Sequence, residues 1–116
     1  MTEHQELKER TLTIDFSQNS LRDVTLFTGR KNGRKAKTLF SVALCDRYVF
    51  KANKEQVITS SYFLGLIGDE LRILLNKLSS INELISRIDT SSLNVVSQEE
   101  CVRAIRRGLS SNEIEL

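Results

Sequence analysis

Alternation of apolar and polar side chains marks the first element that the chain predicts. Leu12, Ile14 and Phe16 recur at every second position within residues 11–16, which is the period of a strand that buries one face. The same alternation returns in residues 46–53 and predicts a second strand of this kind. Two shorter apolar segments predict further short strands: residues 24–27 and 57–58.

Apolar residues at a helical period follow these strand segments. One helix face is predicted within residues 33–44 by the spacing i, i+3, i+4, i+7: Ala36, Leu39, Phe40 and Ala43. A longer stripe predicts a helix over residues 61–78: Phe63, Leu64, Ile67, Leu71, Leu74, Leu75 and Leu78. Gly65 and Gly68 lie inside this stripe, and each weakens a helix by about 1 kcal/mol relative to alanine. We therefore expect this helix to approach the sheet, or the backbone of a partner, closely.

The last third of the chain contains two Ser-x-x-Glu sequences, the spacing of a capping box at a helix start. The first begins at Ser80 and predicts a short helix over residues 81–88. The second begins at Ser97 and predicts a helix over residues 98–107 that Gly108 closes. Between the two helices, the sequence predicts a loop at 89–92 and a strand at 93–96.

This order of elements predicts an α/β domain with a mixed sheet of about four strands and helices packed on it. A length of 116 residues favours a single domain. We expect residues 1–10 to be a disordered or short helical lead-in, residues 11–109 to form the domain, and residues 110–116 to be a tail.

Composition and charge narrow the classes of protein. Charged residues make up 28% of the chain and the formal net charge is +2, which is too small to imply a polyanionic partner by itself. No apolar run approaches the roughly 20 residues that span a bilayer, and the polar start of the chain does not resemble a signal peptide. Cys45 and Cys101 are far apart and show no CxxC spacing. We therefore expect a cytoplasmic protein with reduced thiols and no membrane contact.

The most basic segment is residues 29–37, which we expect to be a loop leading into the first turn of a helix. Its candidate anion-binding residues are Arg30, Lys31, Arg34 and Lys35. Cations are unfavourable at a helix N-terminus, so either solvent screens them or an anion compensates them. The segment is thus either a solvated charged face or a site for nucleic-acid phosphates, and it lacks the Walker A sequence. A second basic group has helical spacing and would extend the patch: Arg103, Arg106 and Arg107.

A hydroxyl-rich turn separates the apolar pair at 57–58 from the long helix. Thr59, Ser60 and Ser61 stand where a helix N-cap is expected. A phosphate on Ser60 or Ser61 would also be favoured there, because the free N–H groups and the helix dipole attract negative charge. The turn is therefore a cap, a modification site, or both. We expect the two serines to lie beside the exposed end of the central strand.

Four segments together resemble a known family. They are residues 33–39, with a basic helix start, residues 46–50, the sequence Val57-Ile58-Thr59-Ser60-Ser61-Tyr62-Phe63, and residues 68–71. This pattern is similar to the bacterial STAS-like domain family, relatives of the anti-sigma-factor antagonists. The resemblance covers roughly residues 30–78, and the rest of the chain only by the order of its elements.

In the antagonists a D-S-S-G turn occupies this place, and a partner kinase phosphorylates one serine. Thr59 falls on the Asp, Ser60 and Ser61 fall on the serines, and Tyr62 falls on the Gly. The resemblance implies a non-enzymatic regulatory module, and it implies a protein partner, either an ATPase or kinase or another regulator, that reads Thr59, Ser60, Ser61 and Tyr62.

Candidate catalytic groups are few in the sequence. His4 is the one histidine, so no histidine pair exists for a metal site or a dyad. The available carboxylates near apolar segments are Asp15, Asp69 and Glu70. Asp69 and Glu70 are adjacent on a predicted helix and point in different directions, so they do not form a general acid/base pair. We therefore expect no catalysis, no metal and no cofactor.

Overall fold

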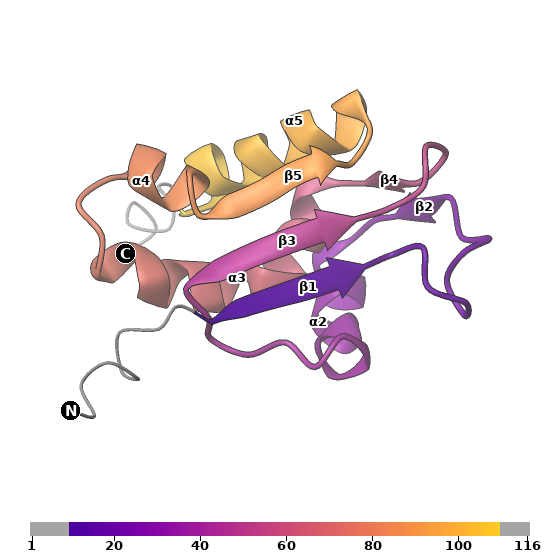
Figure 1. Ribbon diagram of the computed structural model, residues 1–116, viewed down its shortest axis with the longest axis horizontal. Coiled ribbons are helices and arrows are strands. Elements are labelled where there is room, and N and C mark those ends of the chain that lie inside the picture. Colours follow the sequence, from indigo (N-terminus) through magenta and orange to yellow (C-terminus); the bar gives the residue numbers. More distant parts are fainter. Residues whose placement is uncertain (1–9, 110–116) are drawn as a thin grey trace.

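Three parallel strands form the main sheet of the computed structural model, which describes residues 10–109 (Figure 1). The strands are β1 (Thr11–Asp15), β3 (Arg47–Lys51) and β5 (Ile88–Ser92), in the order β1-β3-β5. Parallel registers align Ile14 with Phe50 and Tyr48 with Ile88. The predicted buried face of the first strand is confirmed at Ile14 and Phe16, which are both fully buried.

A second sheet pairs two short strands, β2 (Leu26–Phe27) and β4 (Val57–Ile58), again in parallel. The α/β class is thus confirmed, but the expected mixed sheet of about four strands is wrong. The fully buried side chain of Gln56 shows the physical reason. Its Nε2 donates to the carbonyl oxygens of Phe16, Leu21 and Val24 at 2.8, 3.0 and 2.9 Å. These bonds hold the loop after β1 against β4, so β2 pairs with β4 and does not join the main sheet.

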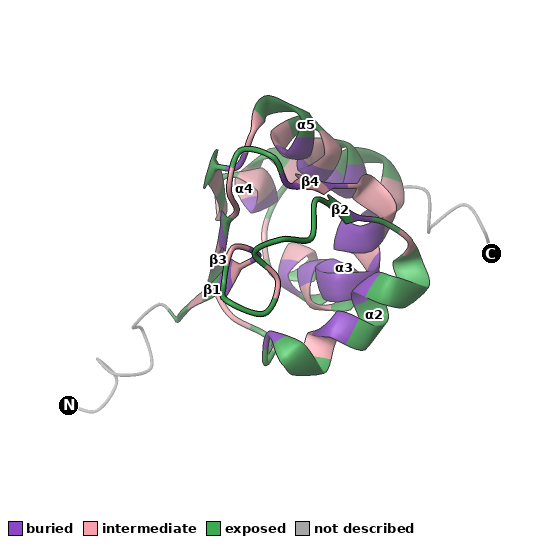
Figure 2. Ribbon diagram, turned by 90° about the vertical axis from the view of Figure 1, so that its right-hand side faces the viewer, coloured by how far each residue is buried: buried purple, intermediate pink, exposed green. Residues whose placement is uncertain are grey.

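The longer helices are α2 (Arg30–Leu39), α3 (Ser60–Asn76) and α5 (Val95–Arg103); α4 (Ile81–Ile85) is a short one, and α5 continues into the π-helical turn η1 (Ala104–Leu109). Buried residues of α3 face the interior of the molecule (Figure 2). Ile67 and Leu71 are 1% and 3% exposed, so both belong to the core as the sequence predicted. Phe16 lies at the centre of an aromatic cluster, with its ring 4.9 Å from that of Phe27 and 5.0 Å from that of Phe40.

Helices α2 and α3 cross at two glycines. A Cβ atom added to Gly65 would collide with the carbonyl oxygen of Arg30, and one added to Gly33 would collide with the carbonyl oxygen of Tyr62. The close approach expected for α3 is therefore made to α2 and not to the sheet. Gly68 has no such requirement, because its nearest contact is a side-chain atom of Leu64 at 3.6 Å.

Two boundaries of the basic helix differ from the prediction of residues 33–44. Helix α2 starts at Arg30, so the basic segment predicted as a loop is mostly helical. It stops at Leu39 because the chain turns into the left-handed region at Ser41, where φ is 54°. Leu39, which the sequence placed on the apolar face, is half exposed, while Phe40 is buried.

The prediction of a loop at 89–92 and a strand at 93–96 is wrong. Strand β5 occupies Ile88–Ser92, and Val95 already belongs to α5. The reason is the N-cap: the side chain of Asn94 accepts a hydrogen bond from Ser97 N at 2.9 Å. The capping box predicted to begin at Ser97 does not form. At Ser80 the predicted cap is confirmed, because its side chain accepts from Glu83 N. The Glu83 carboxylate bonds Ser79 instead of Ser80, so the reciprocal half of the box does not form.

No helix in residues 10–109 is long and apolar enough to cross a bilayer. The expected lead-in, with His4, and the expected tail after Leu109 lie outside the residues that the structure describes.

Candidate functional site

Thr59 is the N-cap of α3. Its Oγ1 accepts from the backbone nitrogen of Tyr62 at 3.4 Å and donates to the carbonyl oxygen of Phe27 at 3.2 Å. Thr59 N also donates to that carbonyl at 2.9 Å. Thr59 therefore fixes the start of α3 to the carboxyl end of β2. The hydroxyl turn, defined as Thr59, Ser60 and Ser61, directly follows β4 and so lies at the end of the small sheet, whereas the sequence predicted a place beside the end of the central strand.

Ser60 meets a carboxylate from the far end of the chain. Its backbone nitrogen donates to Glu100 Oε1 at 2.7 Å, and the other carboxylate oxygen accepts from Arg103 Nη1 at 3.2 Å. A negative charge at a helix N-terminus is favourable, so Glu100 is an internal anion for α3. The Ser-x-x-Glu spacing predicts that Glu100 pairs with Ser97, and nothing in the sequence indicates this contact across 40 positions.

Ser61 lies between the starts of α3 and α2. Its Oγ accepts from Gly29 N at 3.2 Å and lies 3.2 Å from Thr59 Oγ1. Gly29 has a φ of 96°, a conformation that glycine adopts without strain. Ser61 is partly buried and stands one helical turn before Gly65, so it faces α2. The two serines therefore have different surroundings, since the Glu100 carboxylate adjoins Ser60 and the N-terminus of α2 adjoins Ser61.

Tyr62, the fourth candidate of the turn, points into the core. It is 6% exposed, and its ring centroid lies 5.5 Å from that of Phe27 and 6.1 Å from that of Phe16. Burial raises the pKa of Tyr62. Its side chain is a core component beneath the turn.

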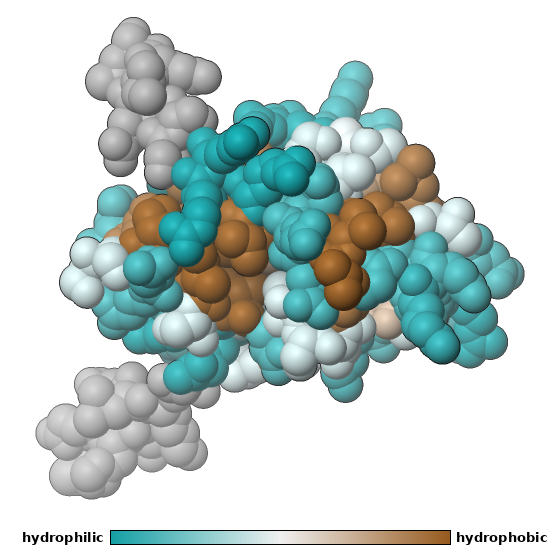
Figure 3. Space-filling model, turned by 90° about the horizontal axis from the view of Figure 1, so that it is seen from above, coloured by the Kyte–Doolittle hydropathy of each residue, from teal (hydrophilic) through white to brown (hydrophobic). Residues whose placement is uncertain are grey.

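Apolar side chains are exposed next to the turn. Val95 and Val96 begin α5 and are 66% and 52% exposed. Val96 and Glu100 are four residues apart on one helix and so are surface neighbours. Apolar side chains gather on the face of the molecule seen from above, on the side of α5 (Figure 3). Glu100 thus stands between Ser60 of the hydroxyl turn and Val96, one helical turn before it on α5.

The four basic candidates all lie on α2 and are exposed: Arg30, Lys31, Arg34 and Lys35. Within residues 10–109 none of them forms an ion pair or a side-chain hydrogen bond. Lys37 differs, because its Nζ donates to Glu70 Oε1 at 2.7 Å and to the carbonyl oxygen of Leu66 at 2.9 Å. Lys37 therefore attaches α2 to α3, while the other four cations face solvent.

The second basic group does not extend this patch. Helices α2 and α5 stand at opposite ends of the molecule with α3 between them (Figures 1 and 2). Arg103 pairs with Glu100, and Arg106 Nη2 donates to Asn82 Oδ1 at 3.0 Å.

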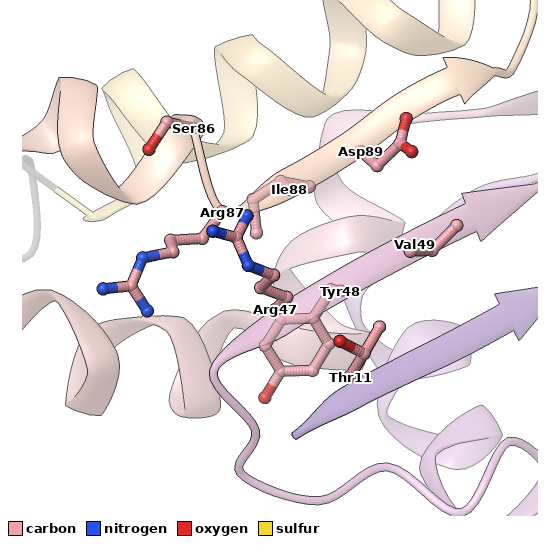
Figure 4. A pocket seen from close by; sticks show the side chains of 8 residues that line it. All are labelled: Thr11, Arg47, Tyr48, Val49, Ser86, Arg87, Ile88 and Asp89. Carbon is pink, nitrogen blue, oxygen red and sulfur yellow. The ribbon is translucent and has the colours of Figure 1, made fainter. Parts of the chain in front are cut away.

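A groove of about 420 Å³, which the sequence did not indicate, lies at the amino ends of the main strands (Figure 4). Several of its polar groups are engaged in loop contacts. Arg87 Nη1 donates to the carbonyl oxygen of Asp46 at 3.2 Å, and Asp89 Oδ1 accepts from Ser91. The Tyr48 hydroxyl donates to Ala43 O and accepts from Cys45 N, and burial raises the pKa of Tyr48 to about 12. Arg87 and Tyr48 thus bond the segment before β3, and Asp89 is bonded within β5.

Other reactive side chains are also engaged. No three His, Cys, Asp or Glu side chains of residues 10–109 are grouped as metal ligands. Burial raises the pKa of Cys101 to about 12, so its thiol is protonated at neutral pH. Asp15 accepts from the nitrogen and Oγ of Ser17, and Asp69 pairs with Arg72 at 3.5 Å.

Comparison of the chain with known protein families, with curated proteins and with solved structures finds no match. The fold is a small α/β fold with parallel sheets.

Proposed function

We propose that this protein is a non-enzymatic regulatory module of STAS-like type that binds a protein partner through the hydroxyl turn and the start of α5. The observation that carries the proposal is the contact of Glu100 Oε1 with Ser60 N at 2.7 Å. It brings the start of α3, with its partly exposed hydroxyl residues, to the helix that begins with the exposed Val95 and Val96. Protein interfaces commonly combine an apolar centre with a polar rim, and this surface has both parts.

The proposal includes a switch at Ser61, modified by a partner kinase that transfers phosphate from ATP to Oγ. A phosphate on Ser60 would stand near the Glu100 carboxylate and be repelled. A phosphate on Ser61 would instead stand near Gly29 N at the N-terminus of α2, where the free N–H groups and the helix dipole favour its charge. Ser61 Oγ lies between α2 and α3, so the added group would also alter the shape of the turn.

The proposed partner is an ATPase, a kinase or another regulator. The proposed location is the cytoplasm, where the free thiols of Cys45 and Cys101 would stay reduced.

Site-specific photocrosslinking tests the proposal. A benzophenone side chain at position 96 should capture a specific partner in cells, and the adduct should weaken when Ser61→Glu is added. Ile73 is the matched control, because it is 47% exposed on α3 but about 18 Å along the helix from Ser61. Equal adducts at positions 73 and 96, or an adduct that Ser61→Glu leaves unchanged, would refute the proposal.

A further inference from the structure

The exposed cations of helix α2 form one continuous face. Arg30, Lys31, Arg34 and Lys35 are spaced i, i+1, i+4, i+5, which places them on one side of a helix. The opposite side carries the buried Gly33 and packs against α3. We call these four side chains the basic face.

The basic face opposes the stability of its own helix. Arg30 and Arg34 are like charges at i, i+4, as are Lys31 and Lys35, and such pairs are destabilising. The first turn contains no acidic residue, and Gly29 supplies no side-chain cap, so the helix dipole also disfavours these cations. The four cations therefore do not stabilise the folded protein by themselves. A bound anionic ligand would neutralise them and would account for their presence.

The surroundings of the basic face indicate the class of anion. A protein partner would be expected to contact exposed apolar or aromatic anchors, but the one exposed apolar side chain of α2 is Leu39, in its last residue. All seven aromatic residues of the chain are buried, each 7% exposed or less. No aromatic platform is thus present on which single-stranded bases could stack.

We propose that the basic face of α2 binds the phosphate backbone of a double-stranded nucleic acid without reading its sequence. The four residues span about 8 Å of helix axis, and a duplex carries one negative charge about every 1.7 Å. One short stretch of backbone therefore meets all four side chains. This surface is distinct from the hydroxyl turn and the valine pair, and its binding does not depend on the proposed partner.

Fluorescence anisotropy with a labelled duplex of about 20 base pairs, titrated at several salt concentrations, tests the proposal. Four phosphate contacts predict a slope of log affinity against log salt of about −3.6. The variant with Arg30, Lys31, Arg34 and Lys35 all changed to Gln should lose most of this slope and at least about tenfold in affinity at low salt.

The matched control changes four exposed cations on other elements to Gln: Arg22, Lys51, Lys54 and Lys77. Both variants lower the formal net charge by four, from +2 to −2, so the control separates this face from overall charge. It should keep the wild-type affinity within about twofold. The α2 variant should melt at or above the wild-type temperature, which excludes unfolding as the cause of lost binding.

Three outcomes would overturn the proposal. They are no salt-dependent binding of the wild type, an equal loss in both variants, and tighter binding of a polyglutamate peptide than of the duplex at the same ionic strength. The last would assign the face to an acidic protein segment.

Discussion

The hydroxyl oxygen of Ser97 lies 3.1 Å from the backbone nitrogen of Ile58 and accepts its hydrogen bond. The same oxygen donates to the carbonyl oxygen of Gln56 at 3.3 Å. Both backbone groups lie on the edge of β4 that faces away from β2, and Ser97 is fully buried. The Ser97 side chain of α5 thus supplies hydrogen-bond partners to two backbone groups in the protein interior, where unpaired polar groups are costly.

Replacing Ser97 with alanine should lower the free energy of unfolding by about 1–3 kcal/mol, because Ile58 N and Gln56 O would lose a partner. Urea denaturation measures the change. Ser92→Ala is the control, since Ser92 is exposed and should change stability by less than about 0.5 kcal/mol. Equal stability of the Ser97→Ala protein and the wild type would show that water replaces the hydroxyl.

Alanine substitutions at two glycines of α3 should have opposite effects. Gly65→Ala should destabilise by at least about 1–3 kcal/mol, because the new methyl group meets the backbone of Arg30. Gly68→Ala should stabilise by up to about 1 kcal/mol, since only Leu64 is near and alanine favours a helix. Thermal unfolding of the pair checks the prediction, and a neutral Gly65→Ala would mean that α2 and α3 can separate at no cost.

Glutamate substitutions at Ser60 and Ser61 should lower the stability of the protein by different amounts. Ser60→Glu should be more destabilising than Ser61→Glu, by about 1 kcal/mol, because Glu100 adjoins Ser60. Adding Glu100→Gln to each variant should remove most of the difference, and chemical denaturation of all four proteins gives the coupling energy. A difference that persists without the Glu100 charge would point to shape and not to electrostatics.

The hydrogen bonds of the Glu83 carboxylate predict that the stability of α4 depends on pH. Its side chain accepts from Ser79 Oγ at 2.7 Å and Ser79 N at 2.9 Å, and these bonds lower the pKa of Glu83. Because the folded-state pKa is lowered, the bonds from Ser79 to the ionised Glu83 stabilise the fold fully at pH values above the usual glutamate pKa. This stabilisation is lost as the pH falls through the folded value. Ser79→Ala should raise the pKa of Glu83, as followed by NMR titration, whereas Asn76→Ala, at the end of α3, should not.

The sequence predicted elements whose pattern is local and one-sided. The alternation in β1 and the long stripe of α3 both reflect burial on a single face, and the core residues Ile14, Ile67 and Leu71 followed directly. The position of Thr59 at a helix start was equally readable, because a cap bonds only a few residues away.

Elements held by distant contacts could not be predicted in this way. Strand β5 contains the polar run Asp89 to Ser92, and its pairing with β3 has an irregular register, so no alternation marks it. The contacts of Glu100 with Ser60 and of Gln56 with three loop carbonyls join segments 30 or more residues apart. Residue spacing and helix or strand propensity are local properties, so neither can predict which distant segments will be in contact.

The order of elements repeats along the chain. A main-sheet strand, a short strand and a helix occur as β1-β2-α2 and again as β3-β4-α3, and the two helices meet through one glycine from each. After β5 the chain enters α5 with no short strand, and Ser97 makes the bonds to β4 that a third short strand would make. Helix α5 therefore acts as the cap of a two-unit array, as terminal repeats do in solenoid proteins, and prevents another strand from adding to β4.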